Sequence, residues 1–140
     1  MTQESGINPM EISFFQDEPV LLPLYLALRK LIRSAYPDCE VRVNKTQVSF
    51  RAPRPFAWVW LPPRRNIRGR PEKYLILSFA SETDIVSPLV AECVMMRTGL
   101  FTCHAILSRD EQPGSEFAGY ITESFALRNP GRAAFMAGSK

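Results

Sequence analysis

The spacing of apolar residues changes from helical to strand-like and back to helical along this chain, and that order restricts the fold most. From Glu18 to Tyr36 apolar residues recur at intervals of three and four, which predicts an amphipathic helix ending before Pro37. Segments of strand type follow, and helical spacing returns from Ser115. This order favours an α+β architecture.

The predicted fold class is α+β, with a mainly antiparallel sheet of about five strands and an N-terminal and a C-terminal helix packed on one face. The first strand region begins at Val41 and runs to Phe50, with residues 44–46 as a bulge or a continuation. The later strands are expected at Phe56 to Leu61, Lys73 to Ala80 and Phe101 to Ser108. Ser87 to Glu92 is expected to form a short helix and Met95 to Gly99 a turn.

The 140 residues are enough for one α+β domain, which we place at residues 14–128. Residues 1–13 lack periodicity and are expected to form a flexible arm, and residues 129–140 a frayed tail. The apolar stretch from Val20 to Leu28 is much shorter than the roughly 20 residues of a membrane helix. No basic residue precedes Arg29, so the N-terminal segment lacks the basic start of a secretory signal. We therefore expect a cytoplasmic location.

Cysteine spacing favours reduced thiols. The chain holds three cysteines, Cys39, Cys93 and Cys103, and no CxxC pair. An odd number without such a pair fits buried thiols better than a disulfide framework or a zinc site. We therefore expect no metal, and we expect no cofactor because the sequence contains no cofactor-binding motif of high specificity.

Positive charge is concentrated in the middle of the chain. Between Val41 and Lys73 nine basic residues stand against the single acid Glu72. The strand from Phe56 is apolar on both faces, since Ala57, Val59 and Leu61 alternate with large aromatic residues. If helices cover the first set, the opposite face carries an aromatic strip that a partner, a ligand or a loop would cover.

These features suggest a non-enzymatic binding module for an anionic partner, because nucleic acid needs cations for phosphates and aromatic rings for stacking. An acidic protein surface would fit the same residues, and a two-fold homodimer would also bury an uncovered face. The candidate ligand-binding residues are Lys45, Arg51, Arg54, Phe56, Trp58, Trp60, Arg64, Arg65 and His104. The alternative interpretation is that the tryptophans belong to the core and the arginines to a solvated loop.

A small anionic ligand is a second hypothesis for the same region, with a pocket near Lys45, Trp58 and His104. An enzyme is a further alternative, but no catalytic residue is assigned because no nucleophile elbow, phosphate-binding loop or zinc-binding helix motif is present. His104 is the single histidine, and strand alternation turns Cys103 to the opposite face, which disfavours a Cys/His nucleophilic pair.

The strand region carries a pattern made of the run from Val41 to Thr46, the run from Val48 to Arg51 and the run from Phe56 to Val59, preceded by Pro37-Asp38. The resemblance of this pattern is to the bacterial family called domain of unknown function 5655. It extends over residues 14 to 127 and includes Phe101-Thr102-Cys103-His104, where the family pattern reads Trp-Thr-His-His. Cysteine at the first histidine position argues against a paired-histidine metal site. The resemblance implies a small α+β fold and no particular activity.

Overall fold

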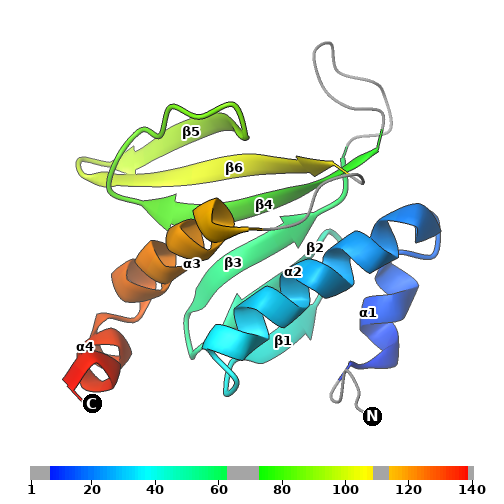
Figure 1. The fold of residues 1–140 in the computed structure, drawn as a ribbon, viewed down its shortest axis with the longest axis horizontal. Helices are drawn as coiled ribbons and strands as arrows, with labels where there is room; N and C mark the ends of the chain where they lie inside the picture. Colours follow the sequence, from blue (N-terminus) through cyan, green and yellow to red (C-terminus); the bar gives the residue numbers. More distant parts are fainter. Residues whose placement is uncertain (1–6, 63–72, 109–113, 139–140) are drawn as a thin grey trace.

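The computed structural model describes residues 7–62, 73–108 and 114–138, and it shows a six-stranded sheet covered by helices on one face (Figure 1). The helical elements are α1 (Pro9–Phe14), the 3-10 turn η1 (Pro19–Leu21), α2 (Leu22–Ala35), α3 (Ser115–Arg128) and α4 (Pro130–Gly138). The strands are β1 (Glu40–Val43), β2 (Gln47–Arg51), β3 (Pro55–Trp60), β4 (Tyr74–Ser81), β5 (Val90–Arg97) and β6 (Leu100–Ser108). The predicted α+β class with an antiparallel sheet is confirmed.

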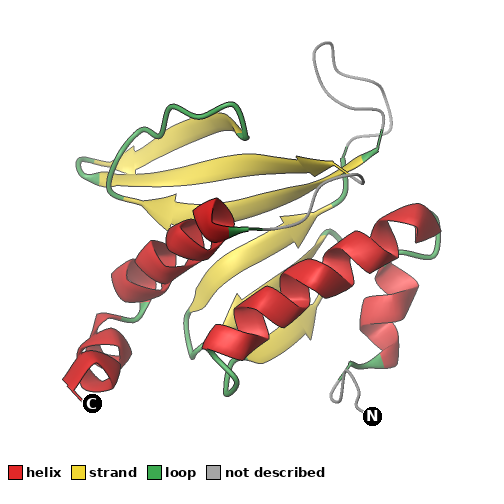
Figure 2. Cartoon of the chain, viewed as in Figure 1, coloured by secondary structure: helices red, strands yellow, loops and turns green. Residues whose placement is uncertain are grey.

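The strands are ordered β1-β2-β3-β4-β6-β5, and every neighbouring pair is antiparallel. The long helices α2 and α3 lie side by side across the same face of this sheet (Figure 2). Most of the buried apolar side chains of the strands point toward these helices. Val48, Val59, Leu77 and Ala105 form one such row across four strands, and each is fully buried. The opposite face has no helix on it among the described residues, and we call it the open face.

The sixth strand is the main difference from the predicted fold. Val90–Arg97 forms the edge strand β5, where a short helix and a turn were expected. Its sequence holds good helix formers such as Ala91 and Met95, but pairing with β6 overrides that local preference. The hairpin closes at Gly99, whose φ of 81° suits a residue without a side chain.

Two further expectations about the strands and cysteines are corrected. Residues 44–46 form the turn of the β1–β2 hairpin, in which the side chain of Asn44 accepts hydrogen bonds from the backbone of Thr46 and Gln47. Cys93 and Cys103 lie directly opposite each other on β5 and β6 and form a disulfide, whereas reduced thiols were expected. Cys39 is free and buried.

The chain ends also carry more structure than predicted. The expected flexible arm, residues 1–13, includes most of α1, and Glu11 of that helix is buried beside Arg29. The expected frayed tail, residues 129–140, includes α4. Both short helices are tied to the rest of the fold by polar contacts that hydrophobic periodicity cannot reveal. None of the described helices has the length and apolar character that crossing a membrane requires.

Candidate functional site

The centre of the open face is a row of side chains that crosses the whole sheet. Strand register places one residue from each strand in this row, and alternation turns all of them away from the helices. From β1 to β5 the row reads Arg42, Ser49, Trp58, Ser78, His104 and Glu92. A neighbouring row on the same face holds Gln47, Trp60, Ile76 and Ile106. The open face is therefore polar in one row and mainly apolar in the next.

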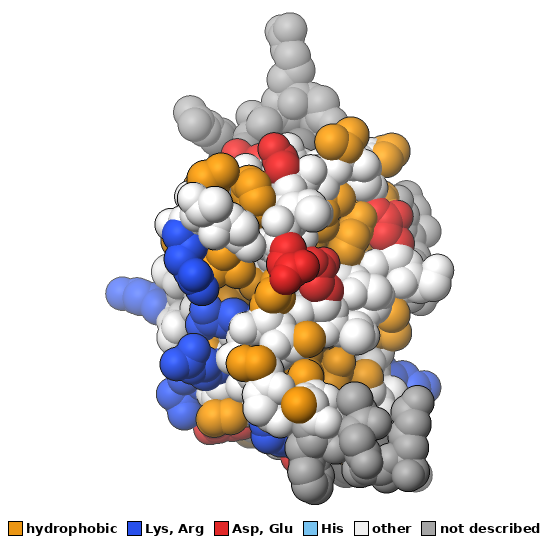
Figure 3. All heavy atoms as spheres, turned by 90° about the vertical axis from the view of Figure 1, so that its left-hand side faces the viewer, with side chains coloured by type: hydrophobic (Ala, Val, Ile, Leu, Met, Phe, Trp, Pro, Cys, Tyr) orange, Lys and Arg blue, Asp and Glu red, His pale blue; other side chains and the backbone are white. Residues whose placement is uncertain are grey.

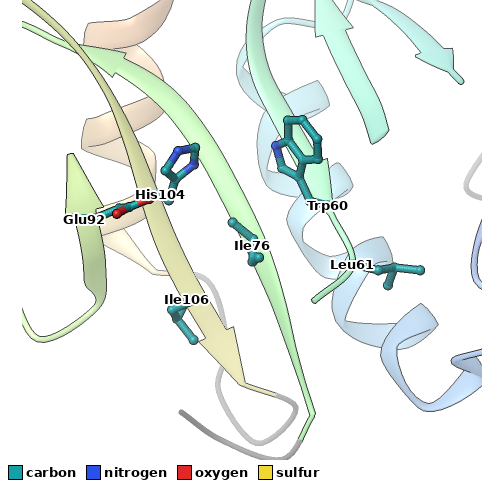
Figure 4. Close-up of a pocket in the computed structure, with 6 residues that line it drawn as sticks. All are labelled: Trp60, Leu61, Ile76, Glu92, His104 and Ile106. Carbon is teal, nitrogen blue, oxygen red and sulfur yellow. The ribbon is translucent and has the colours of Figure 1, made fainter. Parts of the chain in front are cut away.

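A pocket of about 240 Å³ lies where these two rows meet. Its lining is Trp60, Leu61, Ile76, Glu92, His104 and Ile106 (Figure 4). Trp60 and His104 lie on either side of Ile76, and the nitrogen-bearing edge of the indole faces β4 (Figure 4). Aromatic and aliphatic walls with a few polar groups are typical of small-molecule sites.

The indole nitrogen of Trp60 is buried and has no hydrogen-bond partner among the described residues. A buried donor without an acceptor costs about 1–3 kcal/mol relative to a satisfied one. Such an atom in a pocket wall is a position where a bound molecule could supply the missing acceptor.

The ring of His104 is held in place by a neighbouring strand. Its Nδ1 atom lies 2.6 Å from the hydroxyl oxygen of Ser78, which is only 1% exposed. Register also places Glu92 directly beside His104 on the outer side, where its side chain is exposed. This arrangement fixes the orientation of the imidazole, and it brings one carboxylate to the margin of the pocket.

The structure separates the aromatic residues that the sequence analysis grouped together. Trp58 and Trp60 are half-buried on the open face, as alternation predicts. Phe56 is instead fully buried in the helix-covered core, where its ring contacts Tyr36 and Phe125 at centroid distances of 5.3 and 5.1 Å. The pairing of β2 with β3 shifts register at this point, because Phe50 pairs with Ala57 but Arg51 pairs with Pro55. Phe56 lies at this irregularity, and its side chain therefore points to the helix-covered face and not to the open face. The prediction of Phe56 as a ligand-binding residue therefore does not fit its position.

None of the predicted basic residues that the structure describes, Lys45, Arg51 and Arg54, lines the pocket between Trp60 and His104. Lys45 is exposed in the β1–β2 turn and lines a separate hollow of about 850 Å³ on the other side of Trp60. Arg51 ends β2 opposite Glu40, and Arg54 lies beyond it in the β2–β3 loop. Arg64 and Arg65 lie outside the described residues.

Sequence reasoning missed Ser78, Glu92 and Ile76 as neighbours of His104, whereas alternation along the strand places Ile106 on the same face as the histidine. Ser78 and Ile76 lie in a predicted strand, but only the pairing of β4 with β6 shows that they face the histidine. Glu92 lies in the segment that was expected to be helical. No three His, Cys, Asp or Glu side chains of the described chain are placed to hold a metal ion.

Comparison with curated proteins and with solved structures finds no match. A family model matches residues 11–70, a shorter part of the chain than the resemblance in the sequence suggests. The matched part runs from α1 through the end of β3, so it includes Trp60, whereas His104 and Glu92 lie beyond it. Residues 11–70 are therefore similar to the family described as a domain of unknown function, DUF5655.

Proposed function

We propose that the open face is a small-molecule binding site, with the pocket between Trp60 and His104 as its centre. The observation that carries the proposal is that Trp60 lines the pocket while its buried indole nitrogen has no acceptor among the described residues. A ligand that accepts this hydrogen bond would remove the penalty of an unsatisfied donor.

The pocket walls define the chemistry of the ligand. Ile76 and Ile106 provide an apolar floor, and the indole of Trp60 provides a flat wall, so a planar ring compound fits better than a flexible chain. The described lining contains Glu92 and no lysine or arginine. We therefore expect a neutral ring compound with a hydrogen-bond acceptor, or one with a basic group near Glu92.

One feature favours binding over catalysis. Ser78 is 1% exposed, so its hydroxyl serves to orient His104 and is poorly placed to reach a substrate. The described basic residues of the open face include Arg42, which pairs with Glu40 at 3.2 Å. The anionic partner that the sequence suggests is thus less well supported at this pocket than a neutral ligand.

The test is a screen of neutral heteroaromatic fragments by two-dimensional NMR, which resolves the indole N–H signals of Trp58 and Trp60. A true ligand shifts the Trp60 indole signal downfield and perturbs the ring of His104. Trp60→Phe keeps an aromatic wall but removes the donor, and it should weaken binding by about tenfold. Trp58→Phe is the matched control and should bind the fragment as the unmodified chain does.

Equal affinity in the Trp60→Phe variant would overturn the proposal, as would a screen in which no fragment perturbs Trp60 and His104. Backbone spectra of both variants establish that the fold is intact. Self-association through the open face would bury the same residues, so the molar mass in solution is measured alongside. A dimer whose dissociation is required before any fragment binds would identify a second copy as the occupant.

A further inference from the structure

Three arginines meet at a hollow of about 360 Å³ between the β2–β3 loop and the junction of α3 with α4. Arg54 comes from the loop, Arg128 ends α3 and Arg132 lies in the first turn of α4. Figure 3 views the end of the molecule that carries α4, and lysine and arginine side chains gather along one margin of it. The hollow shares no lining residue with the pocket at Trp60.

The hollow is held in shape by hydrogen bonds between segments far apart in sequence. Asn129, which is only 5% exposed, accepts from the backbone N–H of Arg54 at 3.1 Å and donates to its carbonyl at 3.2 Å. Arg128 donates through Nε to the carbonyl of Pro55 at 2.9 Å, and Arg132 donates to the carbonyl of Ala52 at 3.3 Å. These bonds hold the β2–β3 loop against the helix junction and fix the guanidinium groups of Arg128 and Arg132.

No carboxylate is present among the described residues that line this hollow. Elsewhere in the described chain, Arg29, Arg42 and Lys73 each have a carboxylate partner within 4.0 Å, whereas the three arginines of the hollow have none. Burial, and then the nearby charge of Arg54, lower the pKa of Arg128. Holding like charges together costs free energy, which a bound anion would offset.

Two neighbouring groups add to the fit for an anion. The hollow is lined by Pro130 and Gly131, which begin the nine-residue helix α4, and the N-terminal end of a helix carries partial positive charge. The guanidinium of Arg128 also lies 5.8 Å from the centre of the Trp58 ring, which holds it from one side. Arg128 is thereby fixed between a backbone carbonyl and an aromatic face.

We infer that the hollow formed by Arg54, Arg128 and Arg132 is a binding site for a phosphoryl group. Guanidinium groups match the oxygen atoms of phosphate through paired hydrogen bonds, and three of them around one hollow can contact several oxygens of a tetrahedral anion. The phosphoryl group could belong to a small phosphate ester or to the backbone of a single-stranded nucleic acid. This inference is independent of the ligand proposed for the Trp60 pocket.

The test titrates inorganic phosphate, and separately a short single-stranded oligonucleotide, into the full chain and follows the arginine Nε–H signals by NMR. Arg54→Gln and Arg132→Gln should each weaken phosphate binding by about tenfold, because each removes charged hydrogen bonds to the anion. Arg97→Gln is the matched control. It removes the same charge from an exposed position on β5 outside the hollow, and it should leave the affinity unchanged.

The arms of this experiment separate the two sources of the phosphoryl group. If the oligonucleotide binds much more tightly than phosphate, loses affinity in Arg54→Gln and is displaced by added salt, the site serves a nucleic-acid backbone. If phosphate or a small phosphate ester binds as tightly as the oligonucleotide, the site serves a small phosphate compound.

Two results would overturn the inference. One is an equal loss in Arg97→Gln, which would show that only overall charge matters, and the other is the absence of any shift at Arg128 on titration. Arg128→Lys is a second variant that retains the charge but not the planar fork, and it should also weaken phosphate binding. Trp60→Phe should leave phosphate binding intact, so failure of this inference is distinguishable from failure of the proposed function.

Discussion

Arg29 of α2 donates from Nε to a carboxylate oxygen of Glu11 in α1 at 2.7 Å, and both side chains are buried, with exposed fractions of 2% and 0%. The hydroxyl of Tyr25 donates to the same carboxylate. Glu11 also completes the capping box of α1 by accepting from the backbone N–H of Asn8 at 3.0 Å. One carboxylate thus joins α1 to α2, and it explains why residues 9–14 are helical.

Replacing Glu11 should destabilise the fold strongly. Glu11→Gln removes the carboxylate charge that pairs with the buried guanidinium of Arg29, and loss of one partner of a buried ion pair costs about 3–5 kcal/mol. Glu18→Gln is the control, because Glu18 pairs with Lys73 at 2.7 Å while both side chains are about a third exposed, as their fractions of 30% and 37% show. That change should cost about 0–1 kcal/mol. Chemical denaturation measures both, and equal losses would refute the role given to Glu11.

Ser124 of α3 bridges β3 and β4 beyond the last residues that pair between these two strands. Its hydroxyl donates to the carbonyl of Phe56 at 2.7 Å and accepts from the backbone N–H of Ala80 at 2.8 Å. Ser124→Ala leaves both buried backbone groups unsatisfied and should lower the free energy of unfolding by about 1–3 kcal/mol. Thr122→Ala, at an exposed position of the same helix, should have little effect. A small change in Ser124→Ala would mean that water replaces the hydroxyl.

The titration of Glu116 should depend on Ser87. The hydroxyl of Ser87 donates to the Glu116 carboxylate at 2.6 Å, and the hydroxyl of Tyr120 donates to it as well. These two hydrogen bonds, that of Ser87 first, hold the pKa of Glu116 below its ordinary value of 4.5. Ser87→Ala should raise the pKa of Glu116 toward that value, which carboxyl-detected NMR titration measures.

The sign of the effect on stability follows from the same shift. The carboxylate form is favoured in the folded chain, so the contribution of Glu116 is complete above its ordinary pKa and is lost as the pH falls through the lowered one. Thr122→Ala should leave the titration of Glu116 unchanged. A titration midpoint that is identical with and without Ser87 would contradict the hydrogen bond from the loop to α3.

Alkylation should distinguish the two disulfide-bonded cysteines from the one free cysteine. Since Cys93 and Cys103 form a disulfide and Cys39 is free, alkylation in denaturant without reductant should modify one thiol per chain. After reduction, all three cysteines should be modified. Mass spectrometry of chain purified without reductant gives the count, and three modified cysteines before reduction would contradict the disulfide.

The spacing of apolar residues predicted the secondary structure correctly where one face of an element is buried. The spacing of Leu24, Leu28 and Ile32 predicts α2, and these residues are buried in the structure. Alternation likewise predicts that Val59 and Trp60 point to opposite faces of β3, which the structure confirms. It failed at β5, where all but two residues are exposed and no buried face imposes a period.

The candidate sites depend on contacts between distant segments, which a single sequence does not encode in a readable pattern. Trp60 and His104 come together because Ile76 pairs with both Trp60 and Ile106 in neighbouring strands. Arg54 meets Arg128 because Asn129 binds the backbone of the β2–β3 loop. The sequence indicated that tryptophans and basic residues matter, but not which of them are neighbours.

The sequence by itself determined the α+β class, the long helices and the opposite faces to which Val59 and Trp60 of β3 point. These follow from short-range periodicity, because burial of one face repeats every two residues in a strand and about every 3.6 in a helix. Only the tertiary structure decided the sixth strand, the disulfide, the ordering of α1 by Glu11, and the division of basic and aromatic residues between two sites. Strand register and polar contacts between distant residues set these features, and neither leaves a periodic signal in the chain.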